Sequence, residues 1–145
     1  FATRFGERGP TLSPDGRWMA YVSNETGRHE IYVVPFPSVA AERRLISPSG
    51  GTEPIWSPAG GEIFYRNGLG DMVAVRLETE PTLALGSTTV LFPASEYLAN
   101  YYHRQYDVTP DGQRFIMIRP VGGVAQSRLI LVQNFLDELR TRVEG

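Results

Sequence analysis

The sequence predicts an all-β fold, a partial β-propeller of three four-stranded blades followed by a short helix. Its composition is globular, with 41% apolar and 21% charged residues, and rich in turn formers, with 15 Gly and 11 Pro among 145 residues. A four-residue turn motif occurs three times, and its prolines, Pro14, Pro58 and Pro110, lie 44 and 52 residues apart. A period of roughly 40–50 residues with strands around each turn is typical of propeller blades.

The repeated turn covers residues 13–16, 57–60 and 109–112. Proline fixes φ, the aspartate carboxylate can accept hydrogen bonds from nearby backbone, and glycine accepts a positive φ, so Ser/Thr-Pro-Asp-Gly suits a tight turn. In the second copy Ala59 replaces the aspartate, so Gly60 and its neighbour glycine are expected to carry more of that turn. The run after each turn is rich in aromatic and β-branched residues, which predicts a buried strand.

A second strand is expected in each repeat, at residues 29–36, 71–77 and 128–133. Hairpin turns at 24–27 and 67–70 lead into the first two of these strands, and a longer Gly-containing loop at 120–126 leads into the third.

Outer fourth strands fit only the first two repeats, at residues 43–47 and 88–92. The predicted blades therefore span about residues 8–48, 52–93 and 103–134.

The chain is expected to close on a helix over about residues 135–143. Asn134 is a plausible N-cap, and Phe135, Leu139 and Val143 recur at helical spacing. The simplest interpretation of this helix is a cap that packs on the last blade, and the alternative is a partner-docking helix.

Residues 1–5 lie where the outer strand of a preceding blade is expected, whereas the third blade lacks its outer strand. Propellers have typically 4–8 blades, so three blades predict either association with further blades upstream in a longer chain or a second copy. Two copies would make six blades, half a ring each. In that homodimer the strand carrying Phe1, Thr3 and Phe5 would be exchanged to complete the partner's third blade and remove exposed edges.

A family resemblance appears at the repeat residues. Residues 13–21 (Ser-Pro-Asp-Gly-Arg-Trp-Met-Ala-Tyr), with the strand at 29–33, resemble the repeat of TolB-like β-propellers. The motifs at residues 32–37, 50–57 and 106–115 occur in an order that resembles one group of these propellers more closely, the C-terminal propeller segment of bacterial eukaryotic-like Ser/Thr protein kinases. Residues 131–139 are similar to the helix that ends those proteins.

The resemblance implies a sensor or interaction module, extracytoplasmic in that family. Similar blades occur in periplasmic translocation proteins and before prolyl-oligopeptidase-type hydrolase domains. The kinase sequence motifs are absent from this sequence, and the sequence contains no Lys, which a kinase needs to bind ATP phosphates. Kinase activity would therefore belong to a portion of the protein outside this sequence.

The residues suggest no catalytic or cofactor site. No Gly-x-Ser-x-Gly nucleophile elbow occurs, the chain has no Cys, and its two His, His29 and His103, are far apart in the sequence. We therefore expect no enzyme activity, cofactor or metal; a small hydrolase using His103 is the remote alternative. Asp15 and Asp111 occupy equivalent turns, which favours turn capping over a carboxylate pair. A formal charge of −2 does not favour nucleic acid, and no apolar run in this segment is long enough for membrane insertion.

One stretch is not explained by the repeat. Residues 97–106 hold four of the seven Tyr in the chain, with one His and one Arg, in the connection between the second and third blades. This stretch is either a binding or interface loop or local packing over a core edge. Its candidate site residues are Tyr97, Tyr101, Tyr102, His103 and Arg104. The sequence thus predicts a non-enzymatic protein-interaction or sensing module with a protein or peptide ligand, or else an accessory propeller that gates or supports a hydrolase or kinase domain.

Overall fold

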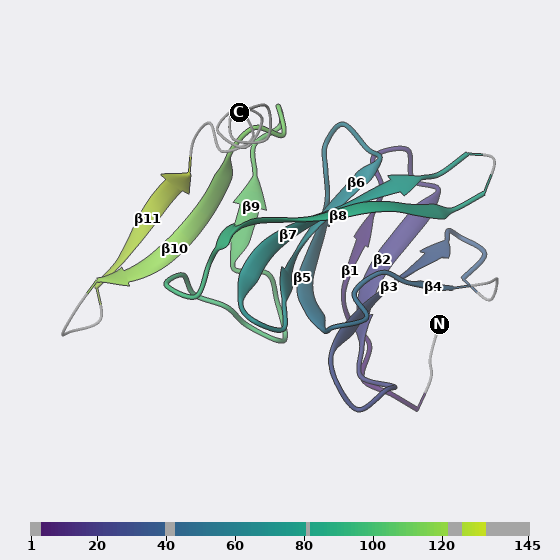
Figure 1. Ribbon diagram of the computed structural model, residues 1–145, viewed down its shortest axis with the longest axis horizontal. Helices are drawn as coiled ribbons and strands as arrows, with labels where there is room; N and C mark the ends of the chain where they lie inside the picture. The colour runs from purple at the N-terminus through teal and green to yellow at the C-terminus, as the bar shows by residue number, and fades with distance from the viewer. Residues whose placement is uncertain (1–3, 40–42, 81, 122–125, 133–145) are drawn as a thin grey trace.

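The computed structural model describes residues 4–39, 43–80, 82–121 and 126–132. Within these residues eleven strands form three antiparallel sheets (Figure 1). Sheet 1 contains β1 (Arg8–Leu12), β2 (Trp18–Ser23), β3 (Glu30–Pro35) and β4 (Arg44–Leu45). Sheet 2 contains β5 (Gly51–Trp56), β6 (Glu62–Asn67), β7 (Asp71–Glu78) and β8 (Ala84–Pro93). Sheet 3 contains β9 (Tyr106–Val108), β10 (Phe115–Val121) and β11 (Gln126–Val132).

Each sheet is a meander, because every strand pairs antiparallel with the next strand in the chain. The three sheets coincide with the three sequence repeats, which confirms the all-β blade architecture, and sheet 3 has three strands in the described residues where four were expected. The hairpin turns are also confirmed: the Gly27 amide donates to the Asn24 carbonyl at 3.0 Å, and the Gly70 amide donates to the Asn67 carbonyl at 3.1 Å.

The repeated turn has the same backbone geometry in all three sheets. The amide of the motif's glycine donates to the carbonyl of its first residue at 2.7–2.8 Å in each copy: Gly16 to Ser13, Gly60 to Ser57, and Gly112 to Thr109. The second turn, which lacks the aspartate, has two successive glycines with positive φ, Gly60 at 76° and Gly61 at 68°. This confirms that glycine supplies the left-handed backbone where Ala59 replaces Asp.

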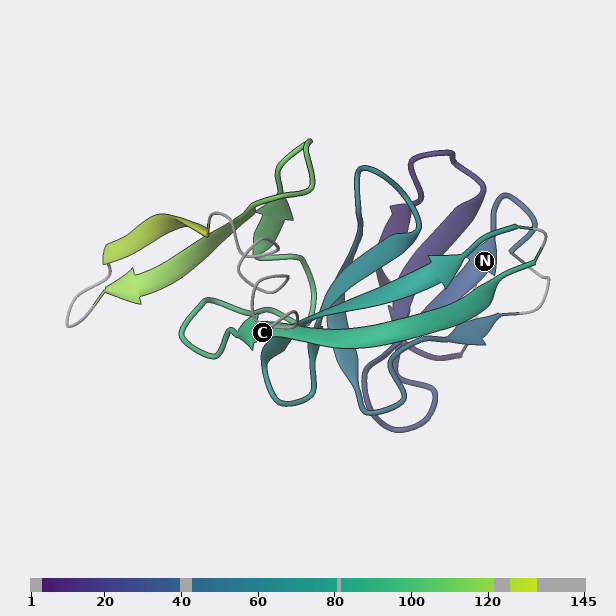
Figure 2. The same cartoon turned by 45° about the horizontal axis from the view of Figure 1, so that its top comes forward.

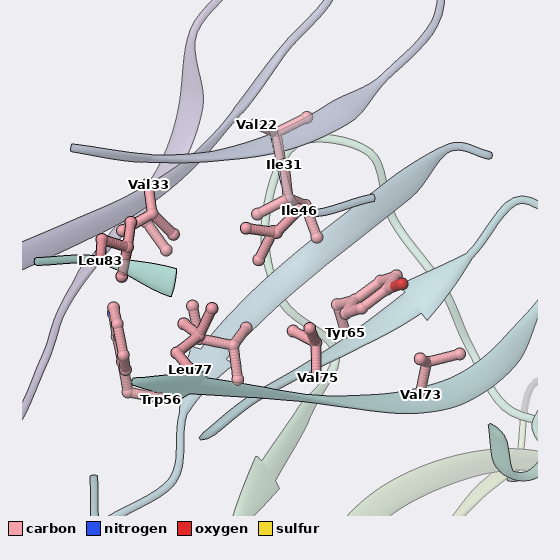
Figure 3. Close-up of a cluster of buried hydrophobic side chains, with 12 residues drawn as sticks. Val22, Ile31, Val33, Ile46, Trp56, Tyr65, Val73, Val75, Leu77 and Leu83 are labelled. Carbon is pink, nitrogen blue, oxygen red and sulfur yellow. The ribbon is translucent and has the colours of Figure 1, made fainter. Parts of the chain in front are cut away.

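Sheets 1 and 2 pack face to face around the larger hydrophobic core (Figure 3). Side chains at alternate positions of β2 and β3 meet those of β5, β6 and β7, as the two-residue period of a strand requires. Trp56 adds a polar link, since its indole Nε1–H donates to the Thr11 carbonyl of sheet 1 at 3.2 Å. The buried members of this core are Ala20, Val22, Ile31, Val33, Ile46, Trp56, Ile63, Tyr65, Val73, Val75, Leu77 and Leu83.

A second core joins sheet 3 to sheet 2. Figure 2 shows β10 and β11 extending away from sheets 1 and 2. Phe115 on β10 is 1% exposed and lies among Phe64, Phe92 and Tyr106 with ring centroids 5.1, 5.6 and 6.1 Å away. Trp56 and Phe64 are likewise buried, and Trp18 is half-buried against the larger core.

The outer strands differ in length from the expectation. β4 covers only Arg44–Leu45, although the Ile46 amide still donates to the Ile31 carbonyl at 2.9 Å before the chain turns away. β8 covers ten residues, Ala84–Pro93, because two register shifts let it follow β7 along the whole length of that strand. β10 and β11 pair as far as Val121↔Gln126, so the loop between them is shorter than the one expected over 120–126.

The two ends of the chain leave part of the prediction untested. Phe1, Thr3 and the predicted helix at 135–143 lie outside the described residues. Phe5 is described and lies in a bend, so the described part of this chain has no strand before β1. Sheet 3 holds three strands in the described residues, with β11 at its edge.

Candidate functional site

The connection between β8 and β9 carries the predicted binding loop, which we call the aromatic loop (residues 97–104). It lies beside the start of β5, the β2–β3 turn and the β6–β7 turn, since all four segments line one hollow of about 540 Å³. Two of these segments touch closely: a Cβ added to Gly68 would lie 2.8 Å from the Ser49 carbonyl oxygen, so the position requires glycine. The loop thus lies at one end of sheets 1 and 2, beside their turns.

Tyr101 reaches across to the β2–β3 turn of sheet 1. Its ring stacks on His29, with centroids 5.1 Å apart and an interplanar angle of 24°, yet its side chain remains largely exposed, with a residue exposure of 62%. Stacking restricts the ring while most of its surface stays accessible. An exposed but oriented tyrosine is suited to contact a ligand.

Tyr102 is held in a similar way by a different strand. The guanidinium carbon of Arg8, on β1, lies 4.5 Å from the centroid of the Tyr102 ring, which is a cation–π contact. Tyr102 is 68% exposed. The two adjacent tyrosines therefore rest on sheet 1 from a loop that begins in sheet 2.

The other candidate residues have distinct places. Tyr97 is half-buried against the second core, so it packs locally, as the alternative interpretation expected. His103 is exposed and lines a second hollow of about 450 Å³. Arg104 lines the same hollow, donates through Nε to the Tyr106 carbonyl at 2.9 Å, and has Asp107 at 3.7 Å. The loop separates the two hollows, because Tyr101 lines both of them.

A buried ion pair beneath the loop was not foreseen from the sequence. The Arg66 Nε donates to a Glu53 carboxylate oxygen at 2.8 Å, and the side chains are 4% and 1% exposed. Arg66 Nη1 and Nη2 donate to the carbonyls of Ala94 and Leu98 at 2.7 and 3.1 Å. The only signal in the sequence was the position of Arg66 directly after the apolar residues Ile63, Phe64 and Tyr65 of β6.

The Glu53 residue also anchors the far end of the loop. Its second carboxylate oxygen accepts the Gln105 amide at 2.7 Å, and its carbonyl accepts the Tyr106 hydroxyl at 2.7 Å. Burial raises the pKa of the Tyr106 hydroxyl well above its usual value, so this group remains a donor. Glu53 itself has a left-handed φ of 57°, uncommon for a residue with a side chain.

The two repeat aspartates cap their turns. The Asp15 carboxylate accepts the Arg17 amide at 3.1 Å, and the Asp111 carboxylate accepts the Gln113 amide at 3.0 Å. A hydrogen bond from the Ser13 hydroxyl, with Arg17 beside it, lowers the pKa of Asp15 to about 2. The hydroxyl of Thr109 acts in the same way to lower the pKa of Asp111. This confirms turn capping.

No group of three or more His, Asp or Glu side chains is arranged to hold a metal ion among the described residues. Among the same residues no helix is long and apolar enough to cross a membrane.

The chain has distant relatives among curated proteins, although no family model matches it. An uncharacterized protein of Agrobacterium fabrum is 37% identical over 57 residues, which cover 39% of this chain and 20% of the relative. The uncharacterized peptidase YuxL of Bacillus subtilis is 33% identical over 63 residues, which cover 43% of this chain and 10% of that protein. The chain thus aligns with only a fifth and a tenth of these relatives.

Solved structures show the fold. The oligogalacturonate lyase of Vibrio parahaemolyticus superposes with a TM-score of 0.65 at 14% identity, over 92% of this chain and 39% of that chain. A TolB protein of Agrobacterium tumefaciens superposes with a TM-score of 0.59 at 18% identity, over 92% of this chain and 47% of that chain. The acylaminoacyl peptidase of Pyrococcus horikoshii superposes with a TM-score of 0.60 at 13% identity, over 90% of this chain and 23% of that chain. The described sheets are blades like those of TolB-like β-propellers, and the chain covers less than half of each of these three structures.

Proposed function

We propose that this chain forms blades of a larger β-propeller and serves there as a non-enzymatic module that binds a protein segment. The observation that carries the proposal is the state of Tyr101 and Tyr102. Both rings are more than 60% exposed, yet His29 and Arg8 hold them in place. Rigid, accessible tyrosines supply contact area at a low cost in conformational entropy, which is why they are enriched in recognition surfaces.

The lining of the two hollows favours an acidic ligand. Arg28 lines the larger hollow and Arg104 lines the smaller one. Each arginine also faces a carboxylate outside the lining, Glu30 at 3.0 Å from Arg28 and Asp107 at 3.7 Å from Arg104. The one carboxylate among the lining residues is Glu53, and that group is buried and paired with Arg66. The ligand that fits best is an extended acidic peptide with an aromatic side chain that stacks on the tyrosines.

A fluorescence anisotropy titration tests this proposal. Matched acidic, neutral and basic peptides with the same aromatic residues are titrated against the chain, and the acidic peptide is expected to bind most tightly. Combined Tyr101→Ala and Tyr102→Ala substitution should weaken that binding at least about tenfold, or ~1.4 kcal/mol. Arg76→Ala is the control, because Arg76 is exposed on β7 and lines neither hollow. Equal affinity of the tyrosine variant, or no preference for acidic peptides, would refute the proposal.

A second candidate is an accessory propeller that gates or supports a catalytic domain. Two of the similar proteins are named as peptidases, and the chain covers only 10% of one and 23% of the other. The resemblance of residues 106–115 and 131–139 to kinase propeller tails makes a kinase domain the other form of this candidate. The length of the open reading frame upstream of Phe1 distinguishes this candidate from a free-standing propeller. The chain alone is expected to have no turnover in either case.

A further inference from the structure

The first strands of sheets 1 and 2, β1 and β5, share a β-bulge at the same position of the repeat. Leu12 and Trp56 are equivalent, so Gly9 and Glu53, each three residues earlier, are equivalent too. Both lie at a register shift in the pairing of their strand, and both have left-handed backbone, with φ of 55° and 57°. Glycine adopts this conformation without strain, whereas glutamate is strained by its Cβ. A glutamate at this position therefore calls for an explanation beyond the fold.

The partner of this glutamate is also peculiar to the second blade. Arg66 pairs across the sheet with Thr52, just before the bulge, as Val22 pairs with Arg8 in sheet 1. The equivalent residue of sheet 3 is Ile118. The Gly9 and Val22 combination in sheet 1 shows that a blade of this chain forms the same bulge without an ion pair. The pair in sheet 2 is consequently not a requirement of the blade.

What the ion pair does hold is the connection to sheet 3. Arg66 fixes the start of the aromatic loop by donating to the Ala94 carbonyl just before the loop and to the Leu98 carbonyl within it. Glu53 fixes the segment after the loop by accepting the Gln105 amide. The planar guanidinium reaches the carboxylate and both carbonyls at once, which a point-like ammonium cannot do. One buried pair thus secures both stems of the loop that carries Tyr101 and Tyr102.

We propose that Glu53 and Arg66 are positioning residues that hold the aromatic loop in one arrangement across the two hollows. The part that this arrangement plays in ligand binding rests on the proposed function above. A loop held in its binding arrangement loses less conformational entropy when a ligand binds, so the pair, whose side chains are only 4% and 1% exposed, would raise affinity by holding the loop. The buried pair and the strained backbone of Glu53 then serve to position the loop. Gly9 and Val22, at the equivalent positions of sheet 1, form the same bulge without an ion pair.

The test uses a double variant, Glu53→Gly with Arg66→Val, which copies the first blade into the second. It removes both charges together, so no buried charge is left unpaired, and it relieves the left-handed strain. Hydrogen exchange is then measured at the Leu98 and Tyr102 amides, which donate to Ile118 and to Asn100 and not to the pair. Exchange there is expected to quicken by about tenfold or more. The Phe36 amide, bonded to the Arg17 carbonyl in sheet 1, should be unchanged.

A second variant, Arg66→Lys, covers the case in which the double variant does not fold. It keeps the charge opposite Glu53 but loses the fork that reaches both carbonyls, so the same two loop amides should exchange faster. Unchanged exchange at Leu98 and Tyr102 in a folded variant would overturn the proposal, as would equal acceleration at Phe36. The exchange measurement needs no ligand, so it separates this proposal from the proposed function. If the acidic peptide binds the wild type, its affinity for the double variant should fall by about tenfold while the loop tyrosines remain present.

Discussion

The ring of Phe115 meets the ring of Phe64 edge-on, with centroids 5.1 Å apart and an interplanar angle of 82°. The two residues are 1% exposed and belong to sheets 3 and 2, respectively. Edge-to-face pairs of this kind contribute about 0.5–1.5 kcal/mol beyond the burial of their area. This contact lies in the core that joins sheet 3 to sheet 2.

Phe115→Ala should therefore uncouple sheet 3. Loss of a buried phenylalanine costs about 3–5 kcal/mol of unfolding free energy. In a urea titration, the far-UV circular dichroism change should begin before the fluorescence change of Trp18 and Trp56, which report on sheets 1 and 2. Leu69→Ala is the control, because Leu69 is 84% exposed, and it should change little. Coincident transitions at the wild-type midpoint would contradict this expectation.

The two tryptophans provide a matched pair of substitutions. Trp56→Phe removes the Nε1 donor of the Thr11 carbonyl, which should cost about 0.5–1.5 kcal/mol in addition to the change in packing. The Trp18 Nε1 is buried without a hydrogen-bond partner among the described residues. Trp18→Phe therefore removes an unsatisfied donor and should be the less destabilising change. Chemical denaturation of both variants checks the order, and a larger loss for Trp18→Phe would contradict it.

Acid titration should detect the lowered pKa of Asp15 in the first repeat turn. The folded pKa of Asp15 is about 2, below its ordinary value of 3.8. A depressed pKa means that the carboxylate stabilises the fold above the unfolded pKa and that this contribution is lost as the pH falls from about 4 through 2. Carboxyl-detected NMR should find the midpoint near 2. Asp15→Asn should reduce the pH dependence of stability in that range, and a midpoint near 4 would show that the Ser13 hydrogen bond is not formed in solution.

Self-association stays a prediction that light scattering can check. No strand among the described residues pairs with the outer edge of β11, so within that part of the chain the edge is available to a strand from upstream blades or from a second copy. We expect a two-fold homodimer at tens of micromolar, with residues 1–5 of each copy completing the partner's third blade. Deletion of residues 1–8 should give a monomer. A monomeric full chain, or a dimer that persists after the deletion, would exclude this strand exchange.

Much of the fold was predictable because its signals are local. Pro14, Asp15 and Gly16 define a turn from the conformations of three adjacent residues, and the same geometry recurs at the other two copies. The lengths of the outer strands were not predictable, since β4 and β8 are set by how far each follows its neighbour. The sequence identified the candidate site as a stretch of aromatic residues, but it did not predict the contacts of Tyr101 with His29 or of Tyr102 with Arg8.

The sequence by itself determined the repeat, the turns and the apolar runs that form the buried strands, because those depend on residues a few positions apart. Only the tertiary structure decided which of the loop tyrosines pack and which stay exposed. Tyr101 stacks on His29 from 72 positions away in the chain, and Arg66 binds the Leu98 carbonyl across 32. Such contacts depend on how the sheets pack and where β8 ends, and no local pattern of residues specifies either.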